Sequence, residues 1–404
     1  MVEQDEVHTD HIYIEPPDAA VLTDEDSGDE ADHLSGNQLR AEAHVSCLQE
    51  SDESSYYEFD CDSLSNVEKS LNWCAKVDNK TTAPIFPEPS FQKYRDFSPV
   101  ELFELFFDDE LIEHICAETR RYIMQKNNPT LFFTKYEIKT YIGIMILSGY
   151  SSVPNRRMYW ENQADSRHTL VYESMRRNRF ESLMTHIHFA DNDKIDFNDK
   201  LYKLRPLINS LNKKFGDHFV PEQHLSYDES MIRYFGSHGI KQFIANKPIR
   251  FGYKCWSLNS SNGYLLSFEV YQGKSVSSDR QQYEKCFGKS TAPLFSFLDL
   301  LPDNKRLLPY LIYFDNLFTS LKTLVELSNR GYGGTGTWRE NRIPKSCPIS
   351  SKASLSNSDR GAMSFASDAT TNVVIAHWKD NKVVTVGSNC HSVYPTGECR
   401  RFCR

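Results

Sequence analysis

The feature that most constrains the fold is a change in hydrophobic period after Pro221. Beyond this residue, short apolar runs separated by turn residues predict β-strands, whereas the preceding segment has helical spacing. A first strand is predicted at HLSYD, and two more around a turn at Ser260–Gly263, in FGYKCWSLNSSNGYLLSFEVYQG. A helix is expected over about 280–300, then a strand at PYLIYF, a helix at LFTSLKTLVELSNRG and a strand at GYGGTGTW. From Leu225 the predicted order is therefore β-β-β-α-β-α-β, which indicates the α/β class.

This order predicts an RNase H-like core, in which three meandering strands are followed by a crossover helix and a fourth strand. The fourth strand would pair in parallel with the first, so the sheet would be mixed. Asp228 ends the first predicted strand and Asp315 ends the fourth, and the parallel pairing would bring both side chains together in mid-sheet. A carboxylate at the end of a buried strand is costly unless a partner or a cation compensates its charge.

Two neighbouring carboxylates predict a shared divalent cation. Oxygen ligands suit Mg²⁺ or Mn²⁺, and two such ions can support an in-line phosphoryl displacement. The residues leave a plainer interpretation open, because Asp315 can cap a helix starting near Leu317, with Asn316 assisting. Asp228 can equally mark a turn. Glu229 alternates to the opposite face of the strand, so it is not expected to be a ligand.

Charge is divided unevenly along the chain, whose net charge is −9. Residues 1–60 hold 18 Asp and Glu against a single basic residue, Arg40, whereas the remainder holds 37 acidic and 45 basic residues. An acidic arm on a mildly basic body is typical of a nucleic-acid binder, although an ordinary charged surface is the alternative. We interpret residues 1–90 as a disordered arm, because they cannot bury enough apolar surface to offset the entropy of ordering. Ser27, set among carboxylates, is a hypothetical target of an acidophilic kinase.

The segment 91–220 is predicted to be mostly helical. Two capping boxes, Ser98–Glu101 and Thr134–Glu137, mark the starts of helices. The second of these helices has apolar residues at helical spacing in TKYEIKTYIGIMILSGY, and Gly149 is expected to stop it.

The lengths of the apolar runs and the spacing of the cysteines indicate where the protein is located and whether it binds structural zinc. No run approaches the roughly 18 apolar residues that cross a bilayer, so no membrane association is expected. Ten scattered cysteines fit a reducing, intracellular compartment. The last three cysteines lie near His391, but their spacing matches no standard zinc finger closely, so structural zinc is not expected. These cysteines are Cys390, Cys399 and Cys403.

Long motifs point to a family. The chain resembles piggyBac-type transposases in two stretches, LSYDESMIRYFGSHGIKQFIANKPIRFGYKCW and YFDNLFTSLKTLVELSNRGYGGTGTWRENRIP. It is similar to them also in FSPVELFELFFDDELIEHI, EIKTYIGIMILSGY, RRMYWEN and RFESLMTHIHFADND. The resemblance covers about 90–395 and is nearest to the domesticated, transposable-element-derived members. It implies a DDE/D transposase that cuts and joins DNA with two metal ions, with Asp228 and Asp315 matching the first two catalytic, metal-binding aspartates.

The same resemblance implies double-stranded DNA as the partner, at transposon ends or TTAA-type sites. WRENRIP is similar to a family segment that contacts DNA, which points to Arg339 and Arg342. The stretch IKQFIANKPIRFGYK is basic and interleaved with aromatic residues, and phosphate contacts or solvated surface charges are the alternatives for each of its cations. These further candidates are Lys241, Lys247, Arg250 and Lys254. The family's function also implies a nuclear location and a homodimer.

The chain departs from the family pattern after Asp315. The family's third acid lies well downstream, in a Gly-Gly-Val-Asp-type motif, and no such motif follows here. The remaining carboxylates are Glu326, Glu340, Asp359, Asp368, Asp380 and Glu398, and none has the expected context. The end of the chain, TGECRRFCR, also resembles nothing in the family. We therefore interpret 221–395 as an incomplete core and 396–404 as a divergent tail, from an alternative terminus, a truncated copy or a frame change.

The expected function is that of a transposase-derived protein with compromised catalysis. The ancestral reaction is metal-dependent strand cleavage and transfer, and a two-carboxylate site leaves the Mg²⁺ or Mn²⁺ ion under-liganded. The alternatives are a non-catalytic nuclear DNA-binding or chromatin-associated protein that keeps the fold, and a non-functional gene fragment.

Overall fold

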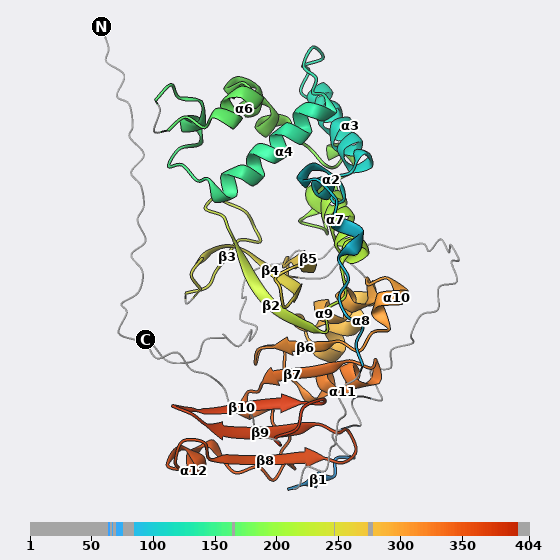
Figure 1. Cartoon of the computed structure of the whole chain (residues 1–404), viewed down its shortest axis with the longest axis vertical. Coiled ribbons are helices and arrows are strands. Elements are labelled where there is room, and N and C mark those ends of the chain that lie inside the picture. Colours follow the sequence, from blue (N-terminus) through green and yellow to red (C-terminus); the bar gives the residue numbers. More distant parts are fainter. Residues whose placement is uncertain are drawn as a thin grey trace, which may run out of the picture. The chain divides into compact units, whose positions relative to one another are not determined.

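A computed structural model of the chain describes residues 64, 67, 70–75, 85–163, 166–245, 247–273 and 278–394, without the side chains of 278 and 279 (Figure 1). Several features of the sequence lie outside these residues. They are the acidic arm to residue 60, Ser27, Glu398, Cys399, Cys403 and the tail 396–404.

The segment 91–220 forms helices, as its apolar spacing predicts (Figure 1). Both predicted capping boxes are present, with reciprocal hydrogen bonds at Ser98–Glu101 and Thr134–Glu137. Gly149 does not stop its helix as predicted, because hydrogen bonding continues to the C-cap residue Ser151. The α-helices are α2 (Pro99–Glu104), α3 (Asp109–Gln125), α4 (Lys135–Tyr150), α5 (Thr169–Ser174), α6 (Arg177–His186) and α7 (Arg205–His218). The short 3₁₀-helices are η2 (Gln92–Tyr94), η3 (Arg156–Trp160), η4 (Asn192–Lys194) and η5 (Tyr202–Leu204).

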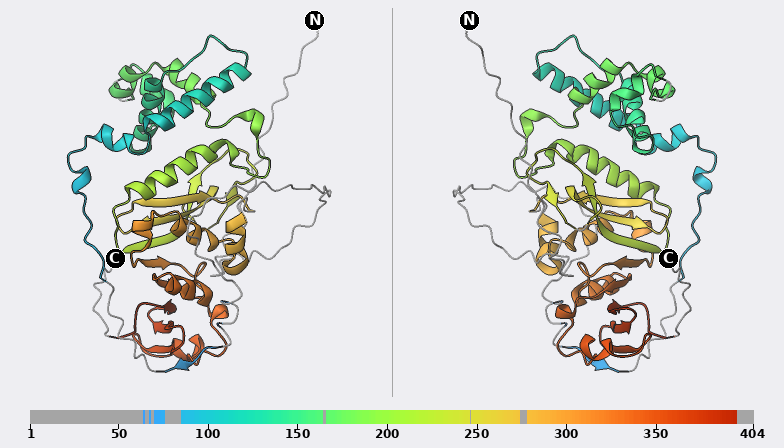
Figure 2. Two further views of the ribbon diagram at one scale, coloured as in Figure 1. Left: turned by 90° about the vertical axis from the view of Figure 1, so that its right-hand side faces the viewer. Right: turned by 90° about the vertical axis from the view of Figure 1, so that its left-hand side faces the viewer.

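The described strands form one mixed sheet of ten strands (Figures 1 and 2). Their order is β1-β8-β9-β10-β7-β6-β2-β4-β3, with β5 beside β4. β6 runs parallel to both β2 and β7, and the other pairs are antiparallel. The strands are β1 (Trp73–Cys74), β2 (His224–Arg233), β3 (Gln242–Phe243), β4 (Phe251–Ser260), β5 (Leu265–Val270), β6 (Leu311–Phe314), β7 (Gly333–Thr337), β8 (Met363–Asp368), β9 (Val374–Lys379) and β10 (Val383–Ser388).

Helices from the second half of the chain pack against this sheet and enclose its main core. α9 packs on β4 and β5, α11 packs on β7, and α8 contacts both helices. The core between them includes Tyr227, Trp256, Phe295, Phe318 and Leu324. These helices are α8 (Ser278–Phe287), α9 (Ala292–Asp299), α10 (Asp303–Arg306) and α11 (Leu321–Asn329), followed by η6 (Glu340–Arg342) and α12 (Lys352–Ser356).

The glycine-rich strand β7 shows why this packing is close. A Cβ atom on Gly334 would lie 2.7 Å from a methyl carbon of Leu327 and 2.9 Å from one of Leu324. Glycine therefore lets α11 lie directly on the sheet, beside the strand β6 that leads to Asp315.

The α/β class and the parallel pairing of the fourth predicted strand with the first are confirmed. The first strand is longer than predicted, because it continues as the partner of β4 as far as Arg233 opposite Gly252. Asp228 therefore lies within the strand instead of at its end. A hairpin at Lys379–Lys382 joins β9 and β10, and β8 occupies a Ser-rich stretch where no strand is predicted.

Candidate active site

The parallel pairing of β2 with β6 brings Asp228 and Asp315 to adjacent positions. Tyr227 lies opposite Phe314 in this register, and each aspartate is the next residue along its chain. Tyr227 and Phe314 are buried, so alternation turns the aspartates to the other face of the sheet, where both are exposed. The structure thus brings together the two residues that the sequence selects as catalytic and metal-binding.

Asp315 is fixed by a turn between β6 and α11. Its Oδ1 accepts a hydrogen bond from the backbone N–H of Leu317 at 2.8 Å, and its carbonyl accepts one from the hydroxyl of Thr319 at 2.8 Å. α11 itself begins at Leu321 with Ser320 as its N-cap, so Asp315 caps the preceding turn and not the helix. The expectation of a helix starting near Leu317 is therefore wrong. The turn holds the carboxylate at the end of β6.

The pKa values of Asp228 and Asp315 are both raised above their ordinary value, mainly because both side chains are partly desolvated. Partial desolvation is the main cause for Asp228, and the nearby charge of Glu229 adds to it. Desolvation is also the main cause for Asp315, followed by the charges of Glu229 and Asp228. In each case the ammonium group of Lys247 acts in the opposite direction. Negative charge therefore accumulates where the middle of β2 meets the end of β6, and a bound cation would relieve this accumulation of charge.

Glu229 and Lys247 join the site in a way that alternation does not predict. Glu229 points toward the core face as expected, but its backbone N–H donates to Oδ1 of Asp228 at 2.8 Å, and the charge of its carboxylate raises the pKa of Asp228. Its Oε1 lies 3.1 Å from Nζ of Lys247, and its Oε2 is buried with no hydrogen-bond partner among the described residues. Lys247, predicted as a DNA contact, is therefore the counter-charge of the acidic cluster. No local signal in the sequence reveals this contact, because it depends on how the loop after β3 folds back.

The donor set fits a divalent cation. Carboxylate oxygens are the preferred ligands of Mg²⁺ and Mn²⁺, and Mg²⁺ commonly takes only one or two carboxylates and keeps several waters. The buried and unpartnered Oε2 of Glu229 is a further sign that the cluster lacks positive charge. Within the part of the chain that the structure describes, no group of three His, Cys, Asp or Glu is arranged to hold a metal. An ion here would thus rely on Asp228, Asp315 and water.

The two arginines of WRENRIP hold the turn that carries Asp315. Arg342 donates through Nη1 to the carbonyls of Asn316, Leu317 and Thr319, at 3.1, 2.9 and 3.3 Å. Arg339 donates through Nε to the side-chain oxygen of Asn316 at 3.2 Å. Both guanidinium groups therefore have a structural role next to the site, and their predicted contact with DNA stays a prediction.

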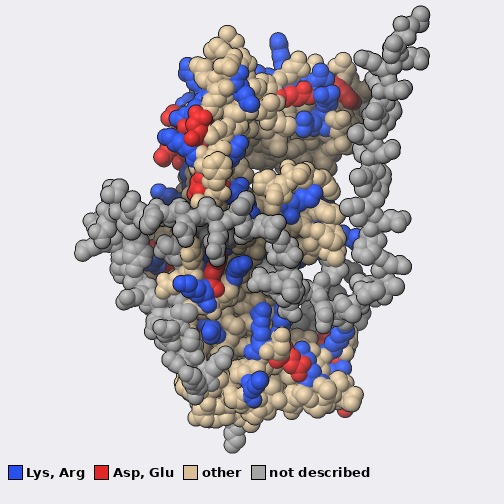
Figure 3. Space-filling model, turned by 180° about the vertical axis from the view of Figure 1, so that it is seen from behind, with Lys and Arg blue, Asp and Glu red and all other residues tan. Residues whose placement is uncertain are grey.

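The other predicted DNA-binding cations lie on the ribbon formed by β2, β3 and β4. Lys241 donates to the carbonyls of Phe235 and Gly236, and Nζ of Lys254 lies 4.2 Å from the ring centre of Trp256. Arg250 is exposed. On the face shown in Figure 3, Lys and Arg side chains are spread widely and Asp and Glu occupy smaller patches. Their contact with DNA also stays a prediction.

Comparison with known proteins decides the family. A family model described as Transposase IS4 matches residues 98–404. The PiggyBac transposable element-derived protein 2 of Homo sapiens is 38% identical over 401 residues, which cover 95% of this chain and 66% of that protein. The chain belongs to the piggyBac-type transposase family. The PiggyBac transposable element-derived protein 3 of Homo sapiens is 36% identical over 427 residues, which cover 97% of this chain and 70% of that protein.

A solved piggyBac transposase shares the fold. The cryo-EM structure of a piggyBac transposase synaptic complex with hairpin DNA is 21% identical and superposes with a TM-score of 0.62. The match covers 77% of this chain and 64% of that chain. The RNase H-like class predicted from the strand order is thereby confirmed. The present chain spans just under two thirds of that transposase and 66% of the first human relative.

Several of the described carboxylates after Asp315 have other partners in this piggyBac-type protein. Glu326 is buried on α11 and pairs with Arg330 at 2.6 Å. Asp368 is buried at the end of β8 and accepts hydrogen bonds from the backbone N–H and hydroxyl of Thr371, each at 2.7 Å. Asp380 pairs with Arg360, Glu340 lies in η6 and Asp359 is exposed in the loop before β8. Among the residues described, none of them completes the pair as a third ligand.

Cys390 and His391 lie just after β10 and contact β6 and β7. His391 Nε2 lies 3.3 Å from the hydroxyl of Tyr313, which lies 3.2 Å from Nδ1 of His224. Sγ of Cys390 lies 3.7 Å from the hydroxyl of Thr335. Two of the cysteines in the zinc interpretation lie outside the described residues, so the expectation of no structural zinc stays a prediction.

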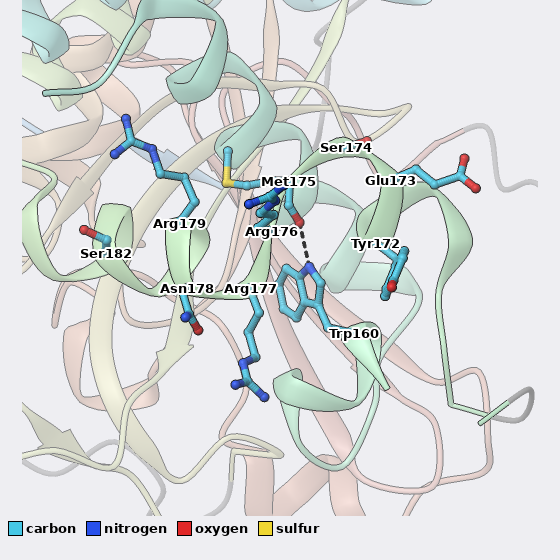
Figure 4. Close-up of a pocket in the computed structure, with 10 residues that line it drawn as sticks. All are labelled: Trp160, Tyr172, Glu173, Ser174, Met175, Arg176, Arg177, Asn178, Arg179 and Ser182. Atoms are coloured by element: carbon cyan, nitrogen blue, oxygen red, sulfur yellow. Dashed lines mark hydrogen bonds between the residues drawn. The ribbon is translucent and has the colours of Figure 1, made fainter. Parts of the chain in front are cut away.

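A second basic surface lies in the helical segment, at the start of α6. A hollow of about 970 Å³ is lined there by Arg176, Arg177, Trp160 and Tyr172, among other residues (Figure 4). Both of these arginines are exposed. Figure 4 also shows the indole N–H of Trp160, which donates to the carbonyl of Met175 at 2.7 Å and fixes one wall. In the parts of the chain covered by the structure, no helix is long and apolar enough to cross a membrane.

Proposed function

We propose that this piggyBac-type chain is a DNA-binding protein of transposase ancestry that binds a divalent cation at Asp228 and Asp315 and does not cleave DNA. The supporting observation is that the carboxylates lie next to a stretch rich in Lys and Arg. Residues 230–256 contain five Lys and Arg and no Asp or Glu, and they begin directly after Asp228 and Glu229. A phosphate backbone held by these cations would pass beside the carboxylates.

The carboxylate pair supports cation binding more strongly than it supports catalysis. A bound Mg²⁺ or Mn²⁺ ion supplies Lewis-acid polarisation of a phosphoryl oxygen and lowers the pKa of a bound water. Asp228 and Asp315 would hold such an ion, and Arg342 would keep the turn of Asp315 in place. Rates fall by orders of magnitude when a site is loosely positioned, and two described carboxylates position an ion less firmly than three.

Double-stranded DNA is the proposed partner, at transposon-end or TTAA-type sites. Family membership supports this proposal, as does the related transposase that was solved with hairpin DNA. The exposed Arg250, and Arg176 and Arg177 of the hollow at α6, are accessible phosphate contacts. We also propose that the chain acts in the nucleus as a homodimer. Light scattering with and without a TTAA duplex tests the dimer, and microscopy of a tagged chain tests the location.

The deciding experiment measures DNA binding, cation binding and cleavage on the same preparations. The wild type should bind a TTAA duplex with a salt-dependent affinity and bind Mn²⁺ in calorimetry, and it should leave nicked and hairpin substrates uncut. Asp228→Asn and Asp315→Asn should each weaken Mn²⁺ binding about tenfold or more, because each removes one of two charged ligands. Asp359→Asn, in an exposed loop, is the matched control. Strand cleavage that either site substitution abolishes would contradict the proposal, and so would the absence of DNA binding.

A further inference from the structure

Beyond Asp228, the sheet continues as a narrow ribbon that is unusually aromatic. We call residues 230–256 the aromatic ribbon; they form the second half of β2, β3 and the first half of β4 (Figure 1). This stretch contains six aromatic residues besides its five cations. β6 pairs with β2 only from His224 to Tyr227, so the ribbon extends past the parallel part of the sheet.

Large apolar side chains of the ribbon are exposed. The exposed fractions are 76% for Phe235, 55% for Phe243, 43% for Phe251 and 46% for Ile232. Isolated exposed apolar residues are common, but a contiguous group indicates a binding surface. Phe243 and Phe251 are cross-strand partners with ring centres 4.7 Å apart, so their rings form one surface.

This aromatic surface lies on the same face of the sheet as Asp228. Asp228 is opposite Ser257 and Ile232 is opposite Tyr253 in the pairing of β2 with β4. Phe251 is two residues before Tyr253, and side chains alternate along a strand, so Phe251 and its partner Phe243 share that face. The close approach of the two strands depends on Gly252, where a Cβ atom would overlap the carbonyl of Ile232.

Cations surround the exposed rings. Nζ of Lys241 lies 5.7 Å from the ring centre of Phe251 and donates to the carbonyl of Phe235. Arg250 precedes Phe251 directly, and Arg233 ends β2; both are exposed. A surface of flat rings edged by positive charge is complementary to a ligand that combines flat apolar faces with negative charge. Unpaired nucleotides have this combination, whereas a paired duplex buries its base faces in the stack.

We propose that the aromatic ribbon stacks on unpaired DNA bases next to the carboxylate pair. This inference rests on the proposed function, because it assumes that the chain binds DNA. Ser257 lies opposite Asp228, and Phe251 is six positions away from Ser257 along β4, a span of about 20 Å at roughly 3.3 Å per residue. That span corresponds to about six steps of a strand at 3.4 Å per nucleotide. A hairpin end, a bulge or a frayed terminus whose backbone passes the carboxylates would therefore place its unpaired bases on Phe243 and Phe251.

The test compares three DNA ligands of one composition: a single strand, a hairpin with an unpaired loop and a blunt duplex. Fluorescence anisotropy at fixed salt gives each dissociation constant, and 2-aminopurine at an unpaired position reports stacking. Phe243→Ala with Phe251→Ala should weaken binding of the single strand and the hairpin roughly fivefold or more and leave the duplex within about twofold. It should also abolish the quenching of 2-aminopurine.

Two further variants keep the test informative. Phe197→Ala is the matched control, because Phe197 is 90% exposed but lies outside the ribbon, and it should change no affinity. Phe235→Ala removes the most exposed ring from a loop of the ribbon, so it should weaken unpaired-DNA binding even if the double variant unfolds. Arg250→Ala should weaken all three DNA ligands alike and reduce the salt dependence, because it removes a phosphate contact.

The outcomes separate this inference from the proposed function. If the wild type binds none of the three DNA ligands, the proposed function fails and the inference fails with it. If the wild type binds DNA and the ring substitutions weaken duplex and unpaired DNA equally, or weaken neither, the proposed function stands and the inference is wrong. If the double variant binds DNA normally but loses a dimer in light scattering, the surface joins two copies of this chain and the inference is likewise wrong.

Discussion

Asp315 combines two roles that the sequence presents as alternatives. One carboxylate oxygen accepts the N–H of Leu317 and closes the turn, as a capping residue would. The side chain nevertheless belongs to the acidic cluster, because its pKa is raised by desolvation and then by the charges of Glu229 and Asp228. A cap fixes the position of a carboxylate without neutralising it. Capping and cation binding are thus compatible at the end of a strand.

Lys247 should compete with a divalent cation. Its ammonium group pairs with Glu229 and also attracts Asp228 and Asp315, so it supplies part of the charge that a metal ion would bring. Lys247→Met should therefore raise Mn²⁺ affinity about fivefold, which corresponds to about 1 kcal/mol of lost repulsion. Calorimetric titration with Mn²⁺ measures this change.

The same substitution should lower stability in the absence of metal, because it leaves the Glu229 carboxylate unpaired. Thermal melts with and without Mn²⁺ should show a larger metal-induced shift for Lys247→Met than for the wild type. Lys241→Met is the matched control, since Lys241 lies on the same ribbon and binds carbonyls instead. Equal Mn²⁺ affinity in wild type and Lys247→Met would show that the lysine does not oppose the cation.

The pairing of Asp228 with Asp315 was accessible from the sequence, whereas the pairing of Glu229 with Lys247 was not. Strand order and alternation are local patterns, and they place two aspartates on one face of neighbouring strands. The contact of Lys247 depends on a loop returning across the strand, and a sequence with five similar cations gives no reason to choose that one. The structural roles of Arg339 and Arg342 were not accessible from the sequence either. Arg342 binds backbone carbonyls and Arg339 binds the side chain of Asn316, and neither contact leaves a pattern in the sequence.

At the scale of elements, Arg342 of η6 connects this short helix to the turn before α11 through hydrogen bonds. Its guanidinium donates to three carbonyls of that turn, those of Asn316, Leu317 and Thr319. Arg342→Ala should lower the free energy of unfolding by about 1–3 kcal/mol, since it leaves these carbonyls without their donor. It should also weaken Mn²⁺ binding, because the position of Asp315 depends on the turn.

Chemical denaturation and Mn²⁺ titration measure both effects of Arg342→Ala. Arg360→Ala is a suitable control, because Arg360 is an exposed residue that pairs with Asp380 at the surface and should contribute less than about 1 kcal/mol. Arg342→Lys should recover only part of the stability, since an ammonium group on a flexible stem is not held in place as Nη1 is by the planar guanidinium. Unchanged Mn²⁺ affinity in Arg342→Ala would show that the turn held by Arg342 does not position Asp315 for cation binding.

The start of α4 should make stability depend on pH in the acid range. Arg179 donates to Glu137, with Nη2 3.0 Å from Oε2, and this bond is the main reason that the pKa of Glu137 falls from 4.5 to about 2. A carboxyl whose pKa is lowered on folding stabilises the native state above its unfolded pKa. That contribution, on the order of 2 kcal/mol, should be lost as the pH falls from about 4.5 to about 2.

Glu137→Gln should lower stability at pH 7 and flatten the loss between pH 4.5 and pH 2 in denaturation curves. Glu101→Gln is the matched control, because Glu101 forms the same kind of capping box but its pKa is lowered by Ser98 alone. An acid transition of unchanged depth in Glu137→Gln would contradict the assignment to the arginine pair.

The elements that the sequence predicted well are those with local signals. Both capping boxes lie where a Ser or Thr precedes a Glu by three residues, and both start a helix there. β8 was missed because its stretch, MSFASD, is half polar and is buried only through its pairing with β9 and β1. The expected stop at Gly149 was wrong, because a glycine ends a helix only where the backbone adopts a non-helical conformation at that residue. Tertiary packing determines whether it does so, and here the helix continues to Tyr150.

At the scale of the whole molecule, the division of charge should control DNA affinity. Residues 1–60 carry 18 acidic residues and one basic residue, while the remainder of the chain has more basic than acidic residues. An anionic arm tethered to a DNA-binding body repels DNA and competes for the same cations, and both effects are screened by salt. A variant that lacks residues 1–60 should therefore bind a duplex about tenfold more tightly at 50 mM salt, and the advantage should shrink toward 300 mM.

Charge and chain length can be separated in the same experiment. A full-length variant in which every Asp and Glu of residues 1–60 is replaced by Asn or Gln should match the deletion, because the arm acts through its charge. A full-length variant with the order of these residues shuffled should match the wild type, since its charge is unchanged. Salt titrations by fluorescence anisotropy give the affinity and the slope for each. If the neutralised arm behaves like the wild type while the deletion binds more tightly, the arm acts by its bulk and the electrostatic explanation is wrong.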